Sequence, residues 1–86
     1  MTADAMPRRW HDAVGAHIDV RGLAPPQPLV AILRLLREQG DPGAPVIVHL
    51  ERDPLMLYPE LAEIGWVAEC VSAEPGAVVL RLERPS

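Results

Sequence analysis

The stretch that decides the fold is HIDVRGLAPPQPLVAILRLLREQG, residues 17–40. Polar and apolar side chains alternate from His17 to Arg21, which is the period of a half-buried β-strand. Gly22 and the proline cluster after it cannot continue a strand. From Leu29 onward apolar residues recur at helical spacing, so a strand, a proline-rich turn and a helix are predicted in that order.

A second strand is expected soon after this helix. Gly40 and the turn residues 41–43 end the helix, and residues 45–50 form a short apolar run rich in β-branched side chains. Such a run is typical of a strand that is buried on both faces. Because only short turns flank the helix, we expect the two strands to be parallel neighbours in a right-handed βαβ unit.

The rest of the chain predicts one more helix and two more strands. Asp53-Pro54 can cap and begin a helix, whose regular part begins near Tyr58 unless its first turn is irregular. Residues 66–72 and 77–84 have the character of strands, and residues 74–76 form a hairpin turn between them.

This order of elements predicts the fold class. We expect an α/β (α+β) two-layer sandwich of order β-α-β-α-β-β, with two helices on one face of a four-stranded mixed sheet. Residues 1–16 have no clean period and are expected to be a loosely ordered lead-in. Residues 17–86 are expected to form a single domain.

Composition excludes several classes of function. The formal net charge is -4 and the basic residues are scattered, so neither nucleic acid nor a membrane surface is an expected partner. No stretch has the length of a membrane helix or the pattern of a signal peptide, so we expect a cytoplasmic protein. All basic residues are Arg, and the absence of Lys, Asn and Phe indicates a GC-rich, bacterial genome.

The residue types that are missing also limit the chemistry. Without Lys the chain has neither a Schiff-base nucleophile nor a P-loop lysine. With Cys70 as its single cysteine it has neither an internal disulfide nor a multi-cysteine zinc site.

Two motifs carry a resemblance to a known family. DVRGLAPPQP, residues 19–28, resembles the signature of the TusA/SirA-like sulfur carriers, in which Asp-x-x-Gly-Leu runs into a Cys-Pro-x-Pro helix start. It is more similar to the domain of unknown function 2249 family, which has Pro-Pro-x-Pro there. That family also has an Asp-Pro-x-x-Leu-Tyr segment, matched by residues 53–58, and often a Gly-aromatic pair, matched by Gly65-Trp66.

The resemblance covers about residues 17–84 and implies a two-layer α/β sandwich, but no settled activity. The position of the carrier cysteine is occupied by Pro25, which has no nucleophile, so carrier chemistry at this helix start is excluded. Many family members have His before the Asp-Pro pair, where this chain has Arg52.

The candidate binding residues follow from the parallel strands. The carboxyl ends of the two strands meet beside both helix starts, where α/β sheets commonly bind ligands. Helix N-termini and arginines there suit an anion. The residues are Asp19, Arg21, Pro25, Pro26, Pro28, Arg52 and Asp53. In the structural alternative, Asp53 is an N-cap and Asp19 pairs with Arg21.

Other reactive side chains are expected to be structural. Cys70 is a candidate sulfur acceptor, but its strand phase predicts a buried and inert thiol. His11, His17 and His49 match no metal motif, and His17 and His49 are expected at opposite ends of the sheet. No metal, cofactor or catalytic residue is therefore predicted.

These observations favour a non-catalytic module that binds an unknown protein partner or a small anion. Two alternatives remain open: a sulfur-transfer protein that uses Cys70, and an accessory or regulatory domain in bacterial redox or respiratory metabolism. The oligomeric state is left open.

Overall fold

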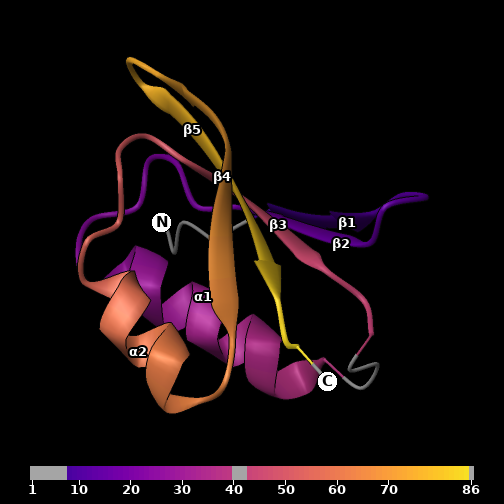
Figure 1. The fold of residues 1–86 in the computed structure, drawn as a ribbon. Helices are drawn as coiled ribbons and strands as arrows, with labels where there is room; N and C mark the ends of the chain where they lie inside the picture. The colour runs from indigo at the N-terminus through magenta and orange to yellow at the C-terminus, as the bar shows by residue number, and fades with distance from the viewer. Residues whose placement is uncertain (1–7, 40–42, 86) are drawn as a thin grey trace, which may run out of the picture.

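A computed structural model describes residues 8–39 and 43–85, which form a mixed sheet with two helices packed on it (Figure 1). In chain order the elements are β1 (Arg8–His11), β2 (Ala16–Asp19), α1 (Gln27–Glu38), β3 (Val46–Leu50), α2 (Leu57–Glu63), β4 (Val67–Glu74) and β5 (Ala77–Glu83). The predicted helix stop at Gly40, the turn residues 41 and 42 and the first part of the lead-in lie outside the described residues.

The predicted βαβ unit is confirmed. Strands β2 and β3 pair in parallel, with Ile18 opposite Val48, and α1 connects them. The side chains of Ile18, Val48 and Ile32 are fully buried, because the apolar stripe of α1 faces the same side of both strands. The two strands therefore end side by side at their carboxyl ends.

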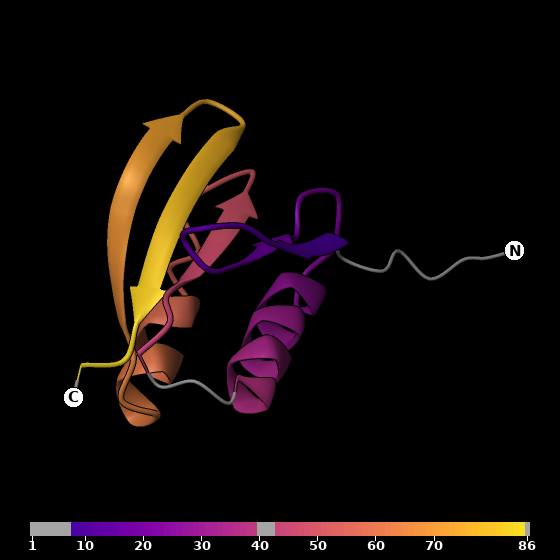
Figure 2. The same ribbon diagram turned by 90° about the vertical axis from the view of Figure 1, so that its right-hand side faces the viewer.

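The C-terminal hairpin completes the sheet. Strand β5 pairs with β3 and with β4, antiparallel in both cases, so the strand order is β1-β2-β3-β5-β4. Val78, Leu80 and Leu82 are buried and face the helices, as predicted. Both helices lie on one side of the sheet, and no helix of the described residues covers the opposite face (Figure 2).

The prediction of four strands was wrong, because the sheet has five. The additional strand, β1, lies within the expected lead-in and pairs antiparallel with β2. All four of its residues are exposed, so it has no buried face that would produce a hydrophobic alternation. It is held by its hydrogen bonds to β2 and by an ion pair of 2.7 Å between Arg9 and Glu38 of α1.

The second helix begins later than the Asp-Pro pair. Residue Met56 is its N-cap, and Leu57 and Leu61 pack into the core. The prediction that the regular helix begins near Tyr58 is confirmed, and the N-cap role of Asp53 is wrong. In the described part of the chain, no helix is long and apolar enough to cross a membrane.

Candidate functional site

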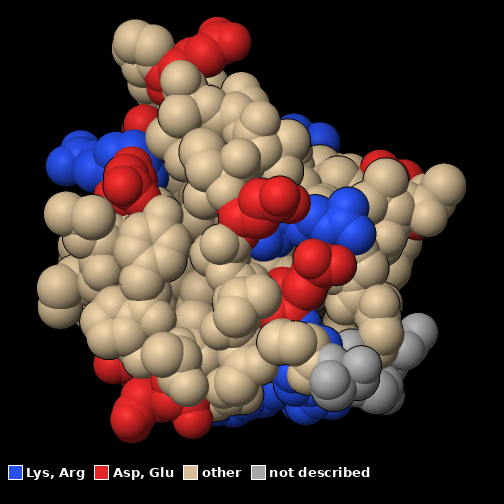
Figure 3. All heavy atoms as spheres, viewed as in Figure 1, with Lys and Arg blue, Asp and Glu red and all other residues tan. Residues whose placement is uncertain are grey.

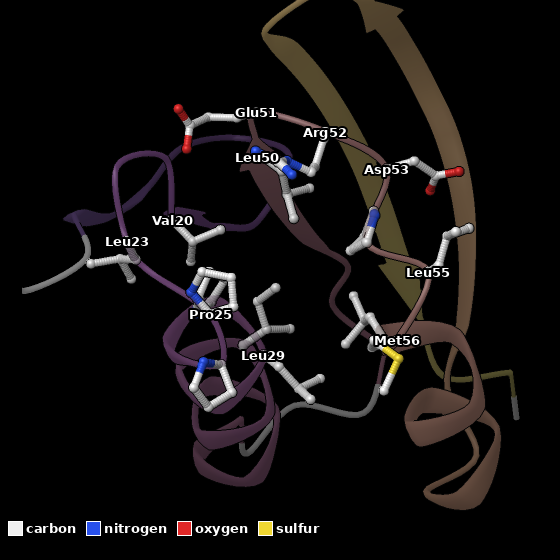
Figure 4. Close-up of a pocket in the computed structure, with 15 residues that line it drawn as sticks. Val20, Leu23, Pro25, Leu29, Leu50, Glu51, Arg52, Asp53, Leu55 and Met56 are labelled. Atoms are coloured by element: carbon white, nitrogen blue, oxygen red, sulfur yellow. The ribbon is translucent and has the colours of Figure 1, made fainter.

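A pocket of about 640 Å³ lies at the carboxyl ends of β2 and β3, between the first turns of α1 and α2 (Figure 4). One wall is formed by residues that come after β2 in the chain, and the other by the last residue of β3 and residues that come after it. The lining residues are Val20, Leu23, Pro25, Pro26, Pro28, Leu29, Ile32, Leu50, Glu51, Arg52, Asp53, Pro54, Leu55, Met56 and Leu57. Its volume is within the range of small-molecule sites.

The local sequence explains why the segment after β2 leaves the sheet at the pocket. Strand β2 stops at a turn in which Gly22 has φ +88°, a conformation that L side chains rarely adopt. Three prolines then line the pocket on the way into α1, and Pro26 is the N-cap. Because prolines do not donate backbone hydrogen bonds, this segment turns away from the sheet and leaves a gap beside β3.

The two walls are tied together at the top of the pocket. The backbone N–H of Val20 donates to the carbonyl of His49 at 3.0 Å, which extends the contact between the strands by one residue. The backbone N–H of Gly22 donates to Oε1 of Glu51 at 3.1 Å. These bonds hold the turn after β2 against the turn after β3.

Apolar side chains dominate the pocket and also its edge. Leu50 and Ile32 form buried parts of its lining. Leu55 and Met56 are 70% and 75% exposed, so large apolar side chains face solvent beside the opening. Both side chains are therefore accessible to a ligand that enters the pocket.

Three charged residues lie on the β3 side of the pocket. Glu51 accepts the hydrogen bond from Gly22, and the carboxylate of Asp53 accepts one from the hydroxyl of Tyr58. Figure 4 shows the Asp53 carboxylate turned away from the pocket. Among the residues that the structure describes, Arg52 has no ion-pair partner. Arg52 is therefore the charge available to a ligand.

Of the seven predicted binding residues, five line this pocket: Pro25, Pro26, Pro28, Arg52 and Asp53. Asp19 and Arg21 do not. Their side chains form a two-pronged pair, with Arg21 Nε 3.0 Å from Oδ1 of Asp19 and Nη2 2.8 Å from Oδ2. The Arg21 hydrogen bonds lower the pKa of the Asp19 carboxyl. This pair matches the structural alternative for these two residues.

The uncovered face of the sheet carries a ring cluster that the sequence analysis missed. His17 and His49 approach each other, with 3.1 Å between Nδ1 of His17 and Nε2 of His49. Trp10 of β1 stacks on both rings at centroid distances of 4.9 and 5.2 Å. Burial and the charge of His17 lower the pKa of His49.

The prediction that His17 and His49 lie at opposite ends of the sheet is therefore wrong. The register pairs Asp19 with His49, which leaves His17 only two residues away on the neighbouring strand. Strands β2 and β3 have only four and five residues. His17 near the start of β2 and His49 near the end of β3 are therefore diagonal neighbours, and their side chains can reach each other.

Comparison with known proteins assigns the chain to a family. The sequence profile of the uncharacterized conserved proteins DUF2249 matches residues 17–84. The chain belongs to the DUF2249 family. No curated protein and no solved structure matches it significantly. Both walls of the pocket, residues 20–29 and 50–57, come from the matched part of the DUF2249 domain.

The single cysteine of this DUF2249 domain is exposed, so the prediction that Cys70 is buried was wrong. Its phase was right, because Cys70 pairs with the buried Leu80 and shares its face of the sheet. Strand β4, however, is an edge strand with an irregularity between Cys70 and Ser72. No strand of the described residues lies beyond β4, so the thiol is open to solvent.

The hydrogen bond between Tyr58 and Asp53 beside the pocket predicts an alkaline titration. Burial, and then the hydrogen bond and charge of Asp53, raise the pKa of Tyr58 to about 12. Tyr58 is the only tyrosine, so its phenolate absorbance can be followed without overlap from another tyrosine. We expect the pKa of Tyr58 to show as a titration midpoint near 12 in the folded protein, against about 10 for an unperturbed tyrosine.

The sign of the effect on stability follows from this pKa. The folded state favours the neutral phenol of Tyr58. The contribution of Tyr58 to the free energy of unfolding is therefore fully present below pH 10 and is lost as the pH rises toward 12. Asp53→Ala should move the midpoint toward 10, although burial should keep it above that value. A wild-type midpoint at 10, with the circular dichroism of the folded protein intact, would contradict this prediction.

Proposed function

We propose that this domain is a non-catalytic binding module, and that its pocket receives a ligand with an apolar body and an anionic end. The observation that carries the proposal is the apolar pocket between the two motif segments, with Arg52 as its available charge. The ligand is either a small organic anion or the apolar segment of a protein partner that bears a carboxylate.

The chemistry of the pocket supports binding rather than catalysis. The sulfur carriers that share the Gly-Leu and Pro-x-Pro pattern have a cysteine where this chain has Pro25, and proline offers neither a nucleophile nor a titrating group. The carboxylates of Glu51 and Asp53 are each occupied by a donor of the chain itself. We therefore propose no bond-making step in the pocket.

Surface charge supports an apolar mode of recognition. On the face seen in Figure 3, basic and acidic groups are interspersed, and uncharged side chains make up most of the surface. A continuous basic area, which a polyanion would require, is not present on that face. Burial of apolar surface then supplies most of the binding free energy, and Arg52 orients the anionic end.

Two dyes of the same shape test this proposal. 1-Anilinonaphthalene-8-sulfonate and the uncharged N-phenyl-1-naphthylamine share an aromatic body and differ in the sulfonate. Both should bind in a saturable 1:1 manner with increased fluorescence. Arg52→Gln should lower the affinity for the sulfonate dye about two- to fivefold, as expected for the loss of an exposed ion pair. It should leave the affinity for the uncharged dye unchanged.

Substitutions at the pocket edge provide the control for the site. Leu55→Glu with Met56→Glu should abolish binding of both dyes without unfolding the protein, because both side chains are exposed. Val30→Glu is the matched variant, since Val30 is 55% exposed on α1 and does not line the pocket. Equal dye binding in the double variant and in Val30→Glu would overturn the proposal.

Exposure of Cys70 supports a second candidate function, sulfur transfer at this thiol. One experiment separates the two functions and the two ligand sources: native mass spectrometry of untagged protein isolated gently from its own host. A covalent mass gain of whole sulfur atoms on Cys70 would favour sulfur transfer. A noncovalent adduct that is lost in the Leu55→Glu, Met56→Glu variant would favour the pocket, and its mass would distinguish a small molecule from a polypeptide.

A further inference from the structure

The cluster of Trp10, His17 and His49 lies on the sheet face opposite the helices and takes no part in the pocket. Its residues come from β1, β2 and β3, three neighbouring strands. The ring of His17 is nearly buried, with 12% of its side chain exposed. Three rings from three strands thus enclose two imidazole nitrogens that face each other.

The distance between these nitrogens suits a shared metal ion. Imidazole nitrogens bind zinc at about 2.0–2.1 Å, so two of them at angles of 90–110° are about 2.8–3.4 Å apart. Nδ1 of His17 and Nε2 of His49 are 3.1 Å apart. In the structure the two nitrogens face each other at hydrogen-bond distance. To bind one ion, both rings would turn so that their lone pairs converge on the metal.

A carboxylate stands behind one of the two rings. Oδ2 of Asp12 lies 2.8 Å from Nε2 of His17, the nitrogen that would not bind the metal. The contact is close but outside hydrogen-bond direction, since Nε2 of His17 has no hydrogen-bond partner. Oδ1 of Asp12 accepts from the N–H groups of Val14 and Gly15 at 2.8 and 3.2 Å, which fixes the carboxylate in place. Metal-binding histidines commonly donate the N–H of their second ring nitrogen to a carboxylate. A turn of the His17 ring would let Nε2 donate to Asp12 in this way.

The number of ligands limits which ions fit. Among the described residues, no three His, Cys, Asp or Glu side chains are arranged around one metal position. The neighbouring carboxylate, Asp19, is held by Arg21. Two imidazoles with water in the remaining positions favour Cu²⁺, Ni²⁺ and Zn²⁺ over Mg²⁺ and Ca²⁺, which prefer oxygen, and Cu²⁺ should bind most tightly.

We propose that His17 and His49 form a two-imidazole site for a divalent transition-metal ion, with Asp12 as a positioning residue and Trp10 covering one side. The site is independent of the pocket, and its presence or absence does not bear on the proposed binding function. Because protons compete for the same nitrogens, the affinity should fall as the pH is lowered.

The test is titration of the full chain with Cu²⁺ alone, and then with Ni²⁺ and Zn²⁺. Bound Cu²⁺ should quench the fluorescence of Trp10, which stacks on both rings, and its electron paramagnetic resonance spectrum should show two nitrogen ligands. His17→Gln and His49→Gln should each lower the Cu²⁺ affinity at least tenfold. His11→Gln is the matched control and should leave affinity and spectrum unchanged, because His11 is exposed and outside the cluster.

Further variants separate the roles of the neighbouring residues. Trp10→Phe should keep the two-nitrogen spectrum and lose the quenching. Asp12→Asn should lower the affinity about tenfold and keep the two-nitrogen spectrum. Binding that is unchanged in His17→Gln or His49→Gln would overturn the proposal. If a histidine variant does not fold, the wild-type spectrum decides, and a copper centre with fewer than two nitrogen ligands would overturn the proposal as well.

Discussion

Replacing Ile32 with alanine should destabilise the protein by about 2–5 kcal/mol, the range for truncating a fully buried aliphatic side chain. Ile32 has 0% exposure and lies in the middle of α1, where it reaches both the core and the pocket. A domain of this length has a total stability of about 4–13 kcal/mol, so the loss is a large share of the whole. Urea unfolding followed by circular dichroism measures it.

A second truncation shows whether the pocket depends on the core. Leu80 of β5 is equally buried, with 1% exposure, but does not line the pocket. Leu80→Ala should cost a similar free energy and leave the affinity for the uncharged dye unchanged, whereas Ile32→Ala should change that affinity because it enlarges the pocket. A loss below about 1 kcal/mol in Ile32→Ala would show that the helix does not pack as described.

The other large effect is expected at Gly15, in the turn between β1 and β2. Its φ is +154°, and a Cβ atom built there would lie 2.5 Å from the carbonyl oxygen of Pro45. That oxygen belongs to the backbone just before β3, so it cannot move aside cheaply. Gly15→Ala should therefore cost about 2–4 kcal/mol through strain and displacement of the β1–β2 hairpin.

Gly76→Ala is the matched control for this substitution. Gly76 also has a positive φ, +76°, but a Cβ atom there would meet nothing within 4 Å. Its cost should be limited to the conformational term of about 1–2 kcal/mol. Thermal unfolding of the two variants compares them directly, and equal losses would show that the close approach to Pro45 is not what requires glycine at residue 15.

The fold was largely predictable from local pattern. The βαβ unit follows from the alternation before Gly22, the apolar stripe of α1 and the apolar run of β3, and each of these patterns reflects burial on a defined side. Strand β1 was missed for the same reason, because Arg8–His11 are exposed throughout. Such a strand is specified by its pairing with β2 and by contacts such as the ion pair of Arg9 with Glu38. Neither kind of contact produces a periodic hydrophobic pattern in the sequence.

The position of the pocket was predictable, but only part of its lining was. Parallel strands bring their carboxyl ends together, and this placed Arg52 and Asp53 correctly beside the prolines. Asp19 faces the other way because alternate residues of β2 point to opposite faces, and its neighbours Ile18 and Val20 are buried. Leu55 and Met56 were missed because nothing in the sequence distinguishes an exposed apolar pair before a helix from one that packs into the core.

The ring cluster and the thiol depend on details that a single sequence does not contain. The contact of His17 with His49 requires the register between β2 and β3, which a shift of one residue would abolish. The exposure of Cys70 depends on the order of strands, which places β4 rather than β5 at the edge. Both are properties of pairing between distant segments.

The exposed apolar pair at the pocket edge has a consequence for evolution. Leu55 and Met56 contribute surface to the pocket but little to the core, since most of each side chain is in solvent. Substitutions at such positions usually change stability by less than about 0.5 kcal/mol. Under the proposed binding function, natural selection can therefore alter what the pocket accepts without a compensating change elsewhere, so that the ligand can change while the scaffold is retained.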